Sequence, residues 1–228
     1  GFVQVDAIAS LGCDELRMDA WGIDVVLAAS QKGMMTPPGL GLVWVSPKAM
    51  ARHDELSTRG EVRSWYWNWT VRKDRSAHYL RYAGTPPVNH IFALREAARM
   101  LLAEGMPNVW ARHAAVAGAV RAAVEAWGRA GALALNVQVP AEQANCVTTI
   151  RTPGFDADVL RKLCETEFGL TLGIGLRSFA GASFRIGHMG YVSGVSILGV
   201  VTTVEAGLRR LGIELAGSGA AAAAAALG

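Results

Sequence analysis

The stretch from Asp24 to Leu42, DVVLAASQKGMMTPPGLGL, constrains the fold of this 228-residue chain more than any other. It begins with a continuous apolar run, Val25 to Ala29, which is typical of a strand buried on both faces of a sheet. A Ser-Gln-Lys tripeptide follows the run, and Pro-Pro-Gly at residues 37–39 indicates a rigid turn. Lys32 is therefore expected at the end of a buried strand, where α/β sheets place their ligands.

The amine of Lys32 would lose part of its hydration at such a place. Desolvation favours the neutral form of an amine, which attacks carbonyl carbons, and this is the reactivity that an imine-forming lysine needs. A lysine after a strand is a weak signal by itself, because most such lysines are solvated surface residues.

A second strand upstream strengthens the signal. The segment from Phe2 to Asp6 alternates apolar and polar residues and ends in a carboxylate. Asp6 and Lys32 would then lie at the same edge of one sheet with opposite charges. They are either a structural ion pair, two unrelated surface charges, or a site for pyridoxal phosphate in which the aspartate faces the pyridinium nitrogen.

Four motifs, taken in order, resemble one known family. They are VDAIASLG, MDAWGIDVVLAASQKGMMTPPGLG, YAGTPPV at residues 82–88, and FRIGHMG at residues 184–190. The chain resembles the class V aminotransferases, which include the alanine–glyoxylate and serine–glyoxylate aminotransferases. The resemblance implies the α/β architecture of pyridoxal phosphate-dependent transferases of fold type I. This chain would supply the C-terminal part of the large mixed-sheet domain and the small α+β C-terminal domain.

The resemblance also implies roles for residues around the ring and phosphate of the cofactor. Lys32 matches the Schiff-base lysine, which also moves the proton at the substrate Cα, and Asp6 matches the carboxylate at the ring nitrogen. Ile8 matches an apolar contact to the ring, and Gln31 matches a contact to the phosphate.

Tyr82 and Thr85 match positions that reach the phosphate of the neighbouring subunit's cofactor. If both roles transfer, the active site is shared between two chains and the enzyme is a homodimer. The alternatives are a tyrosine satisfied in an interface or the core, and a threonine that caps a helix.

Arg185 lies on a predicted strand in FRIGHMG and matches the arginine that holds the substrate carboxylate in the family. A guanidinium suits a bidentate clamp on a carboxylate. The alternative is a salt bridge within the small domain. His188, close by, is interpreted either as a residue that supports a ligand-contacting neighbour or as a structural one.

The chain is expected to divide near Gly105. Residues 1–104 would belong to the large cofactor-binding domain, residues 105–214 to a linker helix and the small domain, and residues 215–228 to a low-complexity tail, either a frayed helix or disordered. The patterns further predict five strands and four helices. The strands are Val25–Ala29, Gly41–Val45, Val147–Arg151 and Ser183–Gly187, with another between Leu170 and Leu176. The helices are Val88–Glu104, Pro107–Gly128, one from Asp156 to Phe168 and a last one from Ser193 or Ser196 to about Leu211.

A tryptophan-rich basic segment has two interpretations. Trp65, Trp67 and Trp69 alternate, which would place them on one face of an extended segment that forms a wall or a subunit contact. Aromatic residues interleaved with Arg63, Arg72, Lys73 and Arg75 are also typical of single-stranded nucleic-acid binding.

Composition excludes several classes of protein. The chain is 51% hydrophobic and 18% charged, with a net charge of +3 and both signs interspersed, so no anionic polymer is required as a partner. Three cysteines without CxxC spacing indicate buried thiols in a cytoplasmic protein. No stretch is long and apolar enough to cross a membrane, and the histidines have no metal-ligand spacing.

The predicted function is therefore a pyridoxal phosphate-dependent aminotransferase. It would transfer the amino group of a small amino acid (serine, alanine or aspartate) to a 2-oxo acid, with glyoxylate as the expected acceptor. The basic cluster makes an acidic donor worth testing. The nearest alternative is a lyase of the same fold, such as a cysteine desulfurase, although Gln31 stands where those enzymes usually carry histidine.

Overall fold

The computed structural model describes residues 1–228 and divides into two compact units. Unit 1 comprises Gly1–Leu11 and Leu16–Leu102, and unit 2 comprises Gly12–Glu15 and Ala103–Gly228. Four residues near the start of the chain, Gly12–Glu15, thus belong to the same unit as its second half.

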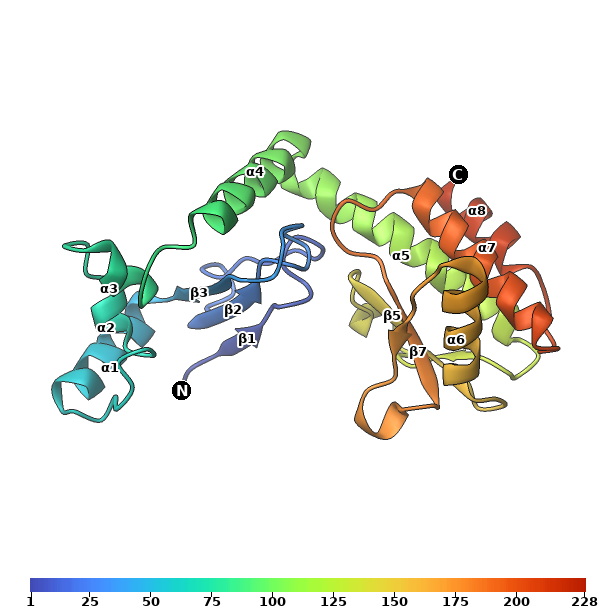
Figure 1. Ribbon diagram of the computed structural model, residues 1–228, viewed down its shortest axis with the longest axis horizontal. Coiled ribbons are helices and arrows are strands. Elements are labelled where there is room, and N and C mark those ends of the chain that lie inside the picture. Colours follow the sequence, from blue (N-terminus) through green and yellow to red (C-terminus); the bar gives the residue numbers. More distant parts are fainter. The chain divides into compact units, whose positions relative to one another are not determined.

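Unit 1 is organised around a three-stranded sheet with the order β1-β2-β3 (Figure 1). β1 (Gln4–Asp6) runs parallel to β2 (Val25–Ala29), and β3 (Gly41–Val45) runs antiparallel to β2. Asp6 is paired with Leu27, and Leu27 is paired on its other side with Val43. These three side chains therefore share one face of the sheet.

Buried Asp24 fixes the start of this sheet. One oxygen of its carboxylate accepts hydrogen bonds from Val3 N at 2.9 Å and Lys48 Nζ at 3.1 Å, and the other accepts one from Ser46 Oγ at 3.1 Å. The Val3 N–H, followed by Lys48 and Ser46, lowers the pKa of Asp24 below its usual value although burial opposes the shift. The starts of β1 and β2 and the end of β3 are thereby joined at one carboxylate.

Only one face of β2 is fully buried, so the prediction of burial on both faces was wrong. Val26 and Ala28 are buried, whereas Val25, Leu27 and Ala29 are half-buried. The loop between β1 and β2 covers the buried face with the small cluster Ala7, Ile23 and Val26. Both faces of the strand are therefore apolar, but residues of this chain bury only one of them fully.

Four helices complete unit 1. α1 (Pro47–Thr58) begins with Ser46 as its N-cap, whose hydroxyl accepts from Ala49 N, and with Pro47 at its first turn. α2 (Trp69–Arg72) and α3 (His78–Tyr82) are short, and α4 (Val88–Glu104) is long and has the predicted bounds. Residues 61–87, which contain α2 and α3, are called the arm below.

The arm is not the extended segment that alternating tryptophans predicted. Asn68 caps α2 by accepting from Thr70 N at 3.0 Å, and Trp69 is the first residue of that helix. Trp69 stacks on His53 of α1 with ring centroids 4.8 Å apart, while Trp65 and Trp67 remain exposed. The helix cap and the stacking override the alternation, so the three indoles do not share a face.

Unit 2 packs a long helix and three others around an antiparallel sheet. The sheet has the order β4-β5-β7-β6, with β4 at Ala134–Leu135, β5 at Val147–Arg151, β7 at Ser183–Gly187 and β6 at Gly173–Ile174. Strand β6 is shorter than the predicted strand between Leu170 and Leu176. The helices are α5 (Met106–Gly128), α6 (Ala157–Phe168, capped by Asp156), α7 (Gly194–Arg210, capped by Ser193) and α8 (Gly219–Leu227).

One continuous core holds unit 2 together. Trp127 of α5, Phe184 and Ile186 of β7, and Leu208 of α7 are all buried in it. Each such side chain contributes about 1.5–3 kcal/mol when it leaves water. None of the helices in either unit combines the length and apolar composition that a membrane crossing requires.

The alanine-rich end of the chain forms α8 and packs into this core. Ser218 caps the helix, Ala223 is buried, and Gly219 lies so close to the Trp127 ring that a Cβ there would come within 2.3 Å of it. Buried Glu205 of α7 accepts from Trp127 Nε1 at 3.0 Å and from Ala220 N at 3.0 Å. This carboxylate therefore joins α5, α7 and α8.

Candidate functional site

Asp6 and Lys32 lie at the carboxyl ends of neighbouring parallel strands. β1 ends at Asp6, and the chain continues with a hydrogen bond from Ala7 N to Leu27 O of 2.8 Å. β2 ends at Ala29, three residues before Lys32. Parallel pairing thus brings both ends to the same edge of the sheet, which is where open α/β sheets bind ligands.

The Asp6 carboxylate is oriented by the backbone and keeps one oxygen open. Its Oδ1 accepts a hydrogen bond from Ile8 N at 2.9 Å, and the side chain is exposed. No contact engages the second oxygen, so it can accept from a ligand. The Ile8 side chain is also partly exposed, at 38%, beside that carboxylate.

The turn that carries Lys32 is held by two buried hydroxyl residues. Ser30 donates through its hydroxyl to Pro37 O at 3.1 Å, and Thr36 donates through its hydroxyl to Ser30 O at 2.9 Å. The Thr36 N–H also donates to Ser30 O, at 3.1 Å. Both residues are buried, whereas Lys32 between them is half-exposed and Gln31 is exposed. The lysine therefore projects from a fixed backbone and remains accessible.

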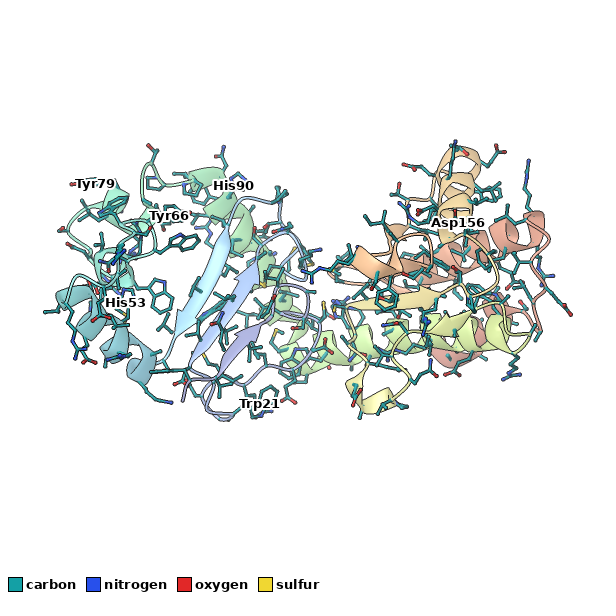
Figure 2. The ribbon with its side chains drawn as sticks, turned by 90° about the horizontal axis from the view of Figure 1, so that it is seen from below. Trp21, His53, Tyr66, Tyr79, His90 and Asp156 are labelled. Carbon is teal, nitrogen blue, oxygen red and sulfur yellow. The ribbon has the colours of Figure 1, made fainter.

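The same turn is also bound to the start of α4. His90 of that helix lies 3.2 Å from Pro38 O through Nε2, and a Cβ at Gly39 would come within 2.6 Å of the His90 ring. Gly39 is thus required for the close approach, and its φ of 153° also favours glycine. Figure 2 labels His90, together with His53, Tyr66 and Tyr79 of unit 1.

Tyr82 and Thr85 lie on the arm, apart from the contacts just described. Tyr82 ends α3, Ala83 follows in the left-handed conformation at φ 58°, and Thr85 is exposed. No side-chain hydrogen bond joins either residue to Asp6 or Lys32 in this chain. Tyr82 instead helps to line an open cavity of about 580 Å³ between β3 and the arm, whose other walls include Val43, Val45, Tyr66, Trp67 and Arg81.

Arg185 lies in unit 2, on β7, and forms no salt bridge. Its Nε donates to Ile174 O at 2.8 Å, which orients the guanidinium, and neither terminal nitrogen has a partner. A Cβ at Gly173 would come within 3.1 Å of the Arg185 Cβ, so this glycine leaves the space that the arginine occupies. The alternative of a salt bridge within unit 2 is contradicted, and the guanidinium is available to a ligand.

His188 is part of the core of unit 2. Its Nδ1 lies 3.1 Å from Asn145 O and its Nε2 lies 2.8 Å from Thr148 Oγ1, so the neutral ring donates to the carbonyl and accepts from the hydroxyl. Burial lowers the pKa of His188 to about 4. It therefore has the structural character that the sequence indicated.

Sequence reasoning missed the residues that hold the site in place. Ser30 and Thr36 brace the lysine turn, and Asp24 fixes the sheet that ends in it. The only local signal was a serine that directly follows the apolar run and a threonine that directly precedes the prolines. Neither residue reveals its hydrogen-bond partner until the turn is folded.

The chemistry of this donor set fits pyridoxal phosphate. An accessible amine and a carboxylate with one open oxygen lie at adjacent strand ends. The amine can hold an aldehyde, and the carboxylate can accept a hydrogen bond from a protonated ring nitrogen. The same edge carries Ile8 and Gln31, an apolar and an amide side chain.

Comparison with known proteins gives concordant matches. A family model described as aminotransferase class-V matches residues 2–205. The chain is 40% identical over 223 residues to an L-aspartate–glyoxylate aminotransferase of Paracoccus denitrificans, covering 96% of this chain and 54% of that protein. It is 38% identical over 223 residues to a serine–glyoxylate aminotransferase of Methylorubrum extorquens, covering 96% and 54%. The chain spans about half the length of the curated relatives it matches.

Solved structures agree with the sequence matches. The crystal structure of a ureidoglycine–glyoxylate aminotransferase from Bacillus subtilis matches with a TM-score of 0.86 at 27% identity, covering 99% of this chain and 57% of that one. A pyridoxamine–pyruvate aminotransferase from Mesorhizobium loti matches with a TM-score of 0.84 at 29% identity, covering 100% and 57%. The predicted fold class, a part of the fold type I architecture of pyridoxal phosphate-dependent transferases, is confirmed. This chain belongs to the class V aminotransferase family.

Proposed function

We propose that the protein is a pyridoxal phosphate-dependent aminotransferase that moves the amino group of a small amino acid to a 2-oxo acid, with glyoxylate as the acceptor. The observation that carries the proposal is the pairing of Asp6 and Lys32 at adjacent parallel strand ends, with the lysine on a braced turn. The names of the glyoxylate aminotransferases among the relatives support the acceptor. Serine, alanine and aspartate are the proposed donors.

In this proposal each residue at the strand ends has a separate role toward the cofactor. When bound, pyridoxal phosphate supplies a ring that withdraws electrons from the substrate Cα. Asp6 keeps the proton on the ring nitrogen through its open oxygen, and Ile8 packs on the ring. Lys32 holds the cofactor by its amine and moves the proton at the substrate Cα. Gln31 contacts the phosphate.

Arg185 binds the substrate carboxylate in this proposal. Two facts support the assignment: the guanidinium has no carboxylate partner of its own, and its Nε is fixed by Ile174 O at 2.8 Å. The two terminal nitrogens can then form the parallel pair of hydrogen bonds that a carboxylate accepts.

Tyr82 and Thr85 contact the phosphate of a cofactor in a second subunit, and the enzyme is a homodimer with shared active sites. The exposure of large apolar side chains in unit 1, among them Trp44, Trp65 and Trp67, supports a further protein surface over this unit. We also propose a cytoplasmic location, because Cys13, Cys146 and Cys164 are all buried as thiols, as expected in a reducing compartment.

The alternatives from the sequence gain no support. A desulfurase needs a reactive, mobile cysteine, but burial raises the pKa of Cys13 to about 12 and that of Cys164 above its usual value. The basic segment offers few cations for nucleic acid, because Arg72 is bonded to backbone carbonyls and Lys73 to Asp54 at 2.6 Å.

The test uses the purified full-length protein, saturated with pyridoxal phosphate. We expect a visible absorption band that one of the three donors bleaches and glyoxylate restores. Lys32→Ala should abolish the band and reduce the rate of transamination by more than about a thousandfold, because both the anchoring amine and the proton-transfer group are lost. Lys162→Ala, which changes an exposed lysine of α6, is the matched control. A normal band in the Lys32→Ala protein would contradict the proposal.

A further inference from the structure

The guanidinium of Arg72, the last residue of α2, is occupied by the backbone of the arm. Its Nε donates to Tyr66 O at 3.1 Å, one terminal nitrogen donates to Trp65 O at 2.9 Å, and the other donates to Leu80 O. The guanidinium also stacks over the Trp65 ring, 4.2 Å from its centroid. All three nitrogens are used on carbonyls, and no carboxylate pairs with the charge.

Arg72 makes these bonds from a fixed base, because α2 is anchored on α1. Thr70 Oγ1 and Lys73 Nζ each donate to Asp54, both at 2.6 Å. The Trp69 N–H donates to His53 Nε2 at 2.9 Å, and the two rings stack. These hydrogen bonds and the ring stack attach both ends of α2 to α1.

The opposite end of the clamp is Leu80, in the middle of α3. This helix has five residues, and Ala77 gives it no side-chain cap. A helix of one turn does not hold its shape without tertiary contacts, since nucleation is costly and too few hydrogen bonds follow. The bond from Arg72 to Leu80 O is the side-chain contact that ties this turn to α2.

Tyr82 and Thr85 therefore lie between two fixed points. Arg72 holds the chain at Leu80, two residues before Tyr82, and the contact of His90 with Pro38 O holds it five residues after Thr85. Between these points the backbone passes through Ala83 in the left-handed conformation. The direction of both side chains thus depends on the position of α3.

We propose that Arg72 is a positioning residue, which holds the arm so that Tyr82 and Thr85 reach the phosphate of a bound cofactor. The inference rests on the proposed function. It assigns to Arg72 no contact with the cofactor or substrate. Lysine is a poor substitute, because a single ammonium cannot span the three carbonyls that the planar guanidinium reaches.

The test compares the affinities of the full-length protein for pyridoxal phosphate and for pyridoxal, which lacks the phosphate. We expect Arg72→Lys to weaken the binding of pyridoxal phosphate about tenfold, the loss expected when one or two hydrogen bonds are broken, and to leave the binding of pyridoxal nearly unchanged. Arg75→Lys is the matched control, because Arg75 is an exposed arginine of the same arm without a hydrogen bond or ion pair.

A second variant shows whether Arg72 acts through Tyr82. Tyr82→Phe should also weaken the binding of pyridoxal phosphate and leave that of pyridoxal nearly unchanged. The affinity lost in the variant with both substitutions should be less than the product of the two single losses. Three results would overturn the inference while leaving the proposed function intact. Arg72→Lys weakens the binding of both ligands equally, or it leaves the ratio of the two affinities unchanged from wild type, or the loss of affinity in the double variant equals the product of the two single losses. Wild-type protein that binds neither ligand would overturn the proposed function and this inference with it.

Discussion

Units 1 and 2 hold their functional residues in different ways. Unit 2 has one continuous apolar core, so Arg185 lies on a strand whose neighbours Phe184 and Ile186 are buried. The buried cluster of unit 1 contains only Ala7, Ile23 and Val26, with partly buried side chains packed around it. Unit 1 instead fixes its site by hydrogen bonds.

Those hydrogen bonds are concentrated at three buried polar residues and at half-buried Arg72. Asp24 joins the strand starts, Ser30 and Thr36 brace the lysine turn, and Arg72 clamps the arm. Such residues place a side chain accurately, but each costs free energy if its partner is lost, because a buried polar group is then unsatisfied. We therefore expect substitutions in the apolar core of unit 2 to act mainly on stability, and substitutions of polar residues in unit 1 to act on the geometry of the site.

The largest expected effect is on the core of unit 2. Phe184→Ala should lower the free energy of unfolding by about 3–5 kcal/mol, because it leaves a cavity where a fully buried ring now packs. Urea denaturation of the full-length protein measures it, with Phe179→Ala, a 36% exposed phenylalanine of the same unit, as the matched control. Hydrogen exchange at residues 30–37 should remain unchanged. Faster exchange at that turn would show that the two units unfold together, and the comparison would fail.

The next effect is a pH dependence in unit 2. Burial by itself would raise the pKa of Glu205, but hydrogen bonds from Trp127 and Ala220 and the Arg209 guanidinium outweigh it and lower the pKa to about 2. A carboxyl group whose pKa is lowered on folding stabilises the protein above its unfolded pKa. That contribution, on the order of 3 kcal/mol, is lost as the pH falls from about 4.5 towards 2.

Urea denaturation between pH 5 and pH 2 tests this prediction. The wild-type protein should lose stability across that range, and Glu205→Gln should be less stable at pH 6 and show a flatter profile. Glu165→Gln, which changes an exposed carboxylate of α6, serves as the control. Parallel profiles for wild type and Glu205→Gln would show that this carboxylate does not anchor α8.

The smallest effect on stability is expected at the lysine turn of unit 1. Thr36→Val removes the hydroxyl that donates to Ser30 O at 2.9 Å and should cost about 1 kcal/mol. The substitution should affect function more than stability. Hydrogen exchange at residues 30–37 should become faster, and the affinity for pyridoxal phosphate should fall. Thr36→Ser keeps the hydroxyl and should resemble wild type. An affinity that is unchanged in Thr36→Val would show that this bond does not position Lys32.

The sequence predicted the elements that local patterns determine. Strands Val25–Ala29 and Val147–Arg151 and helix Val88–Glu104 have the predicted bounds, because apolar runs and periodicity define them directly. The Asp6–Lys32 edge could also be predicted, since parallel strands bring their carboxyl ends together.

The remaining features depend on contacts between distant residues. The cap at Asn68 and the stacking of Trp69 on His53 decide the shape of the arm, and neither is visible in an alternating pattern. The alanine-rich end forms α8 because it packs on Trp127 and because Glu205 accepts hydrogen bonds from both Trp127 and Ala220. The roles of Tyr82, Thr85 and Arg185 stay predictions, because they concern ligands that these contacts do not include.

The most direct test of the central claim asks which lysine holds the cofactor. The full-length protein is loaded with pyridoxal phosphate, reduced with borohydride to fix the cofactor to its lysine, digested and analysed by mass spectrometry. We expect the added mass on the peptide that contains Lys32, and none on the peptides with Lys48, Lys73 or Lys162. Modification of another lysine with Lys32 unmodified would contradict it.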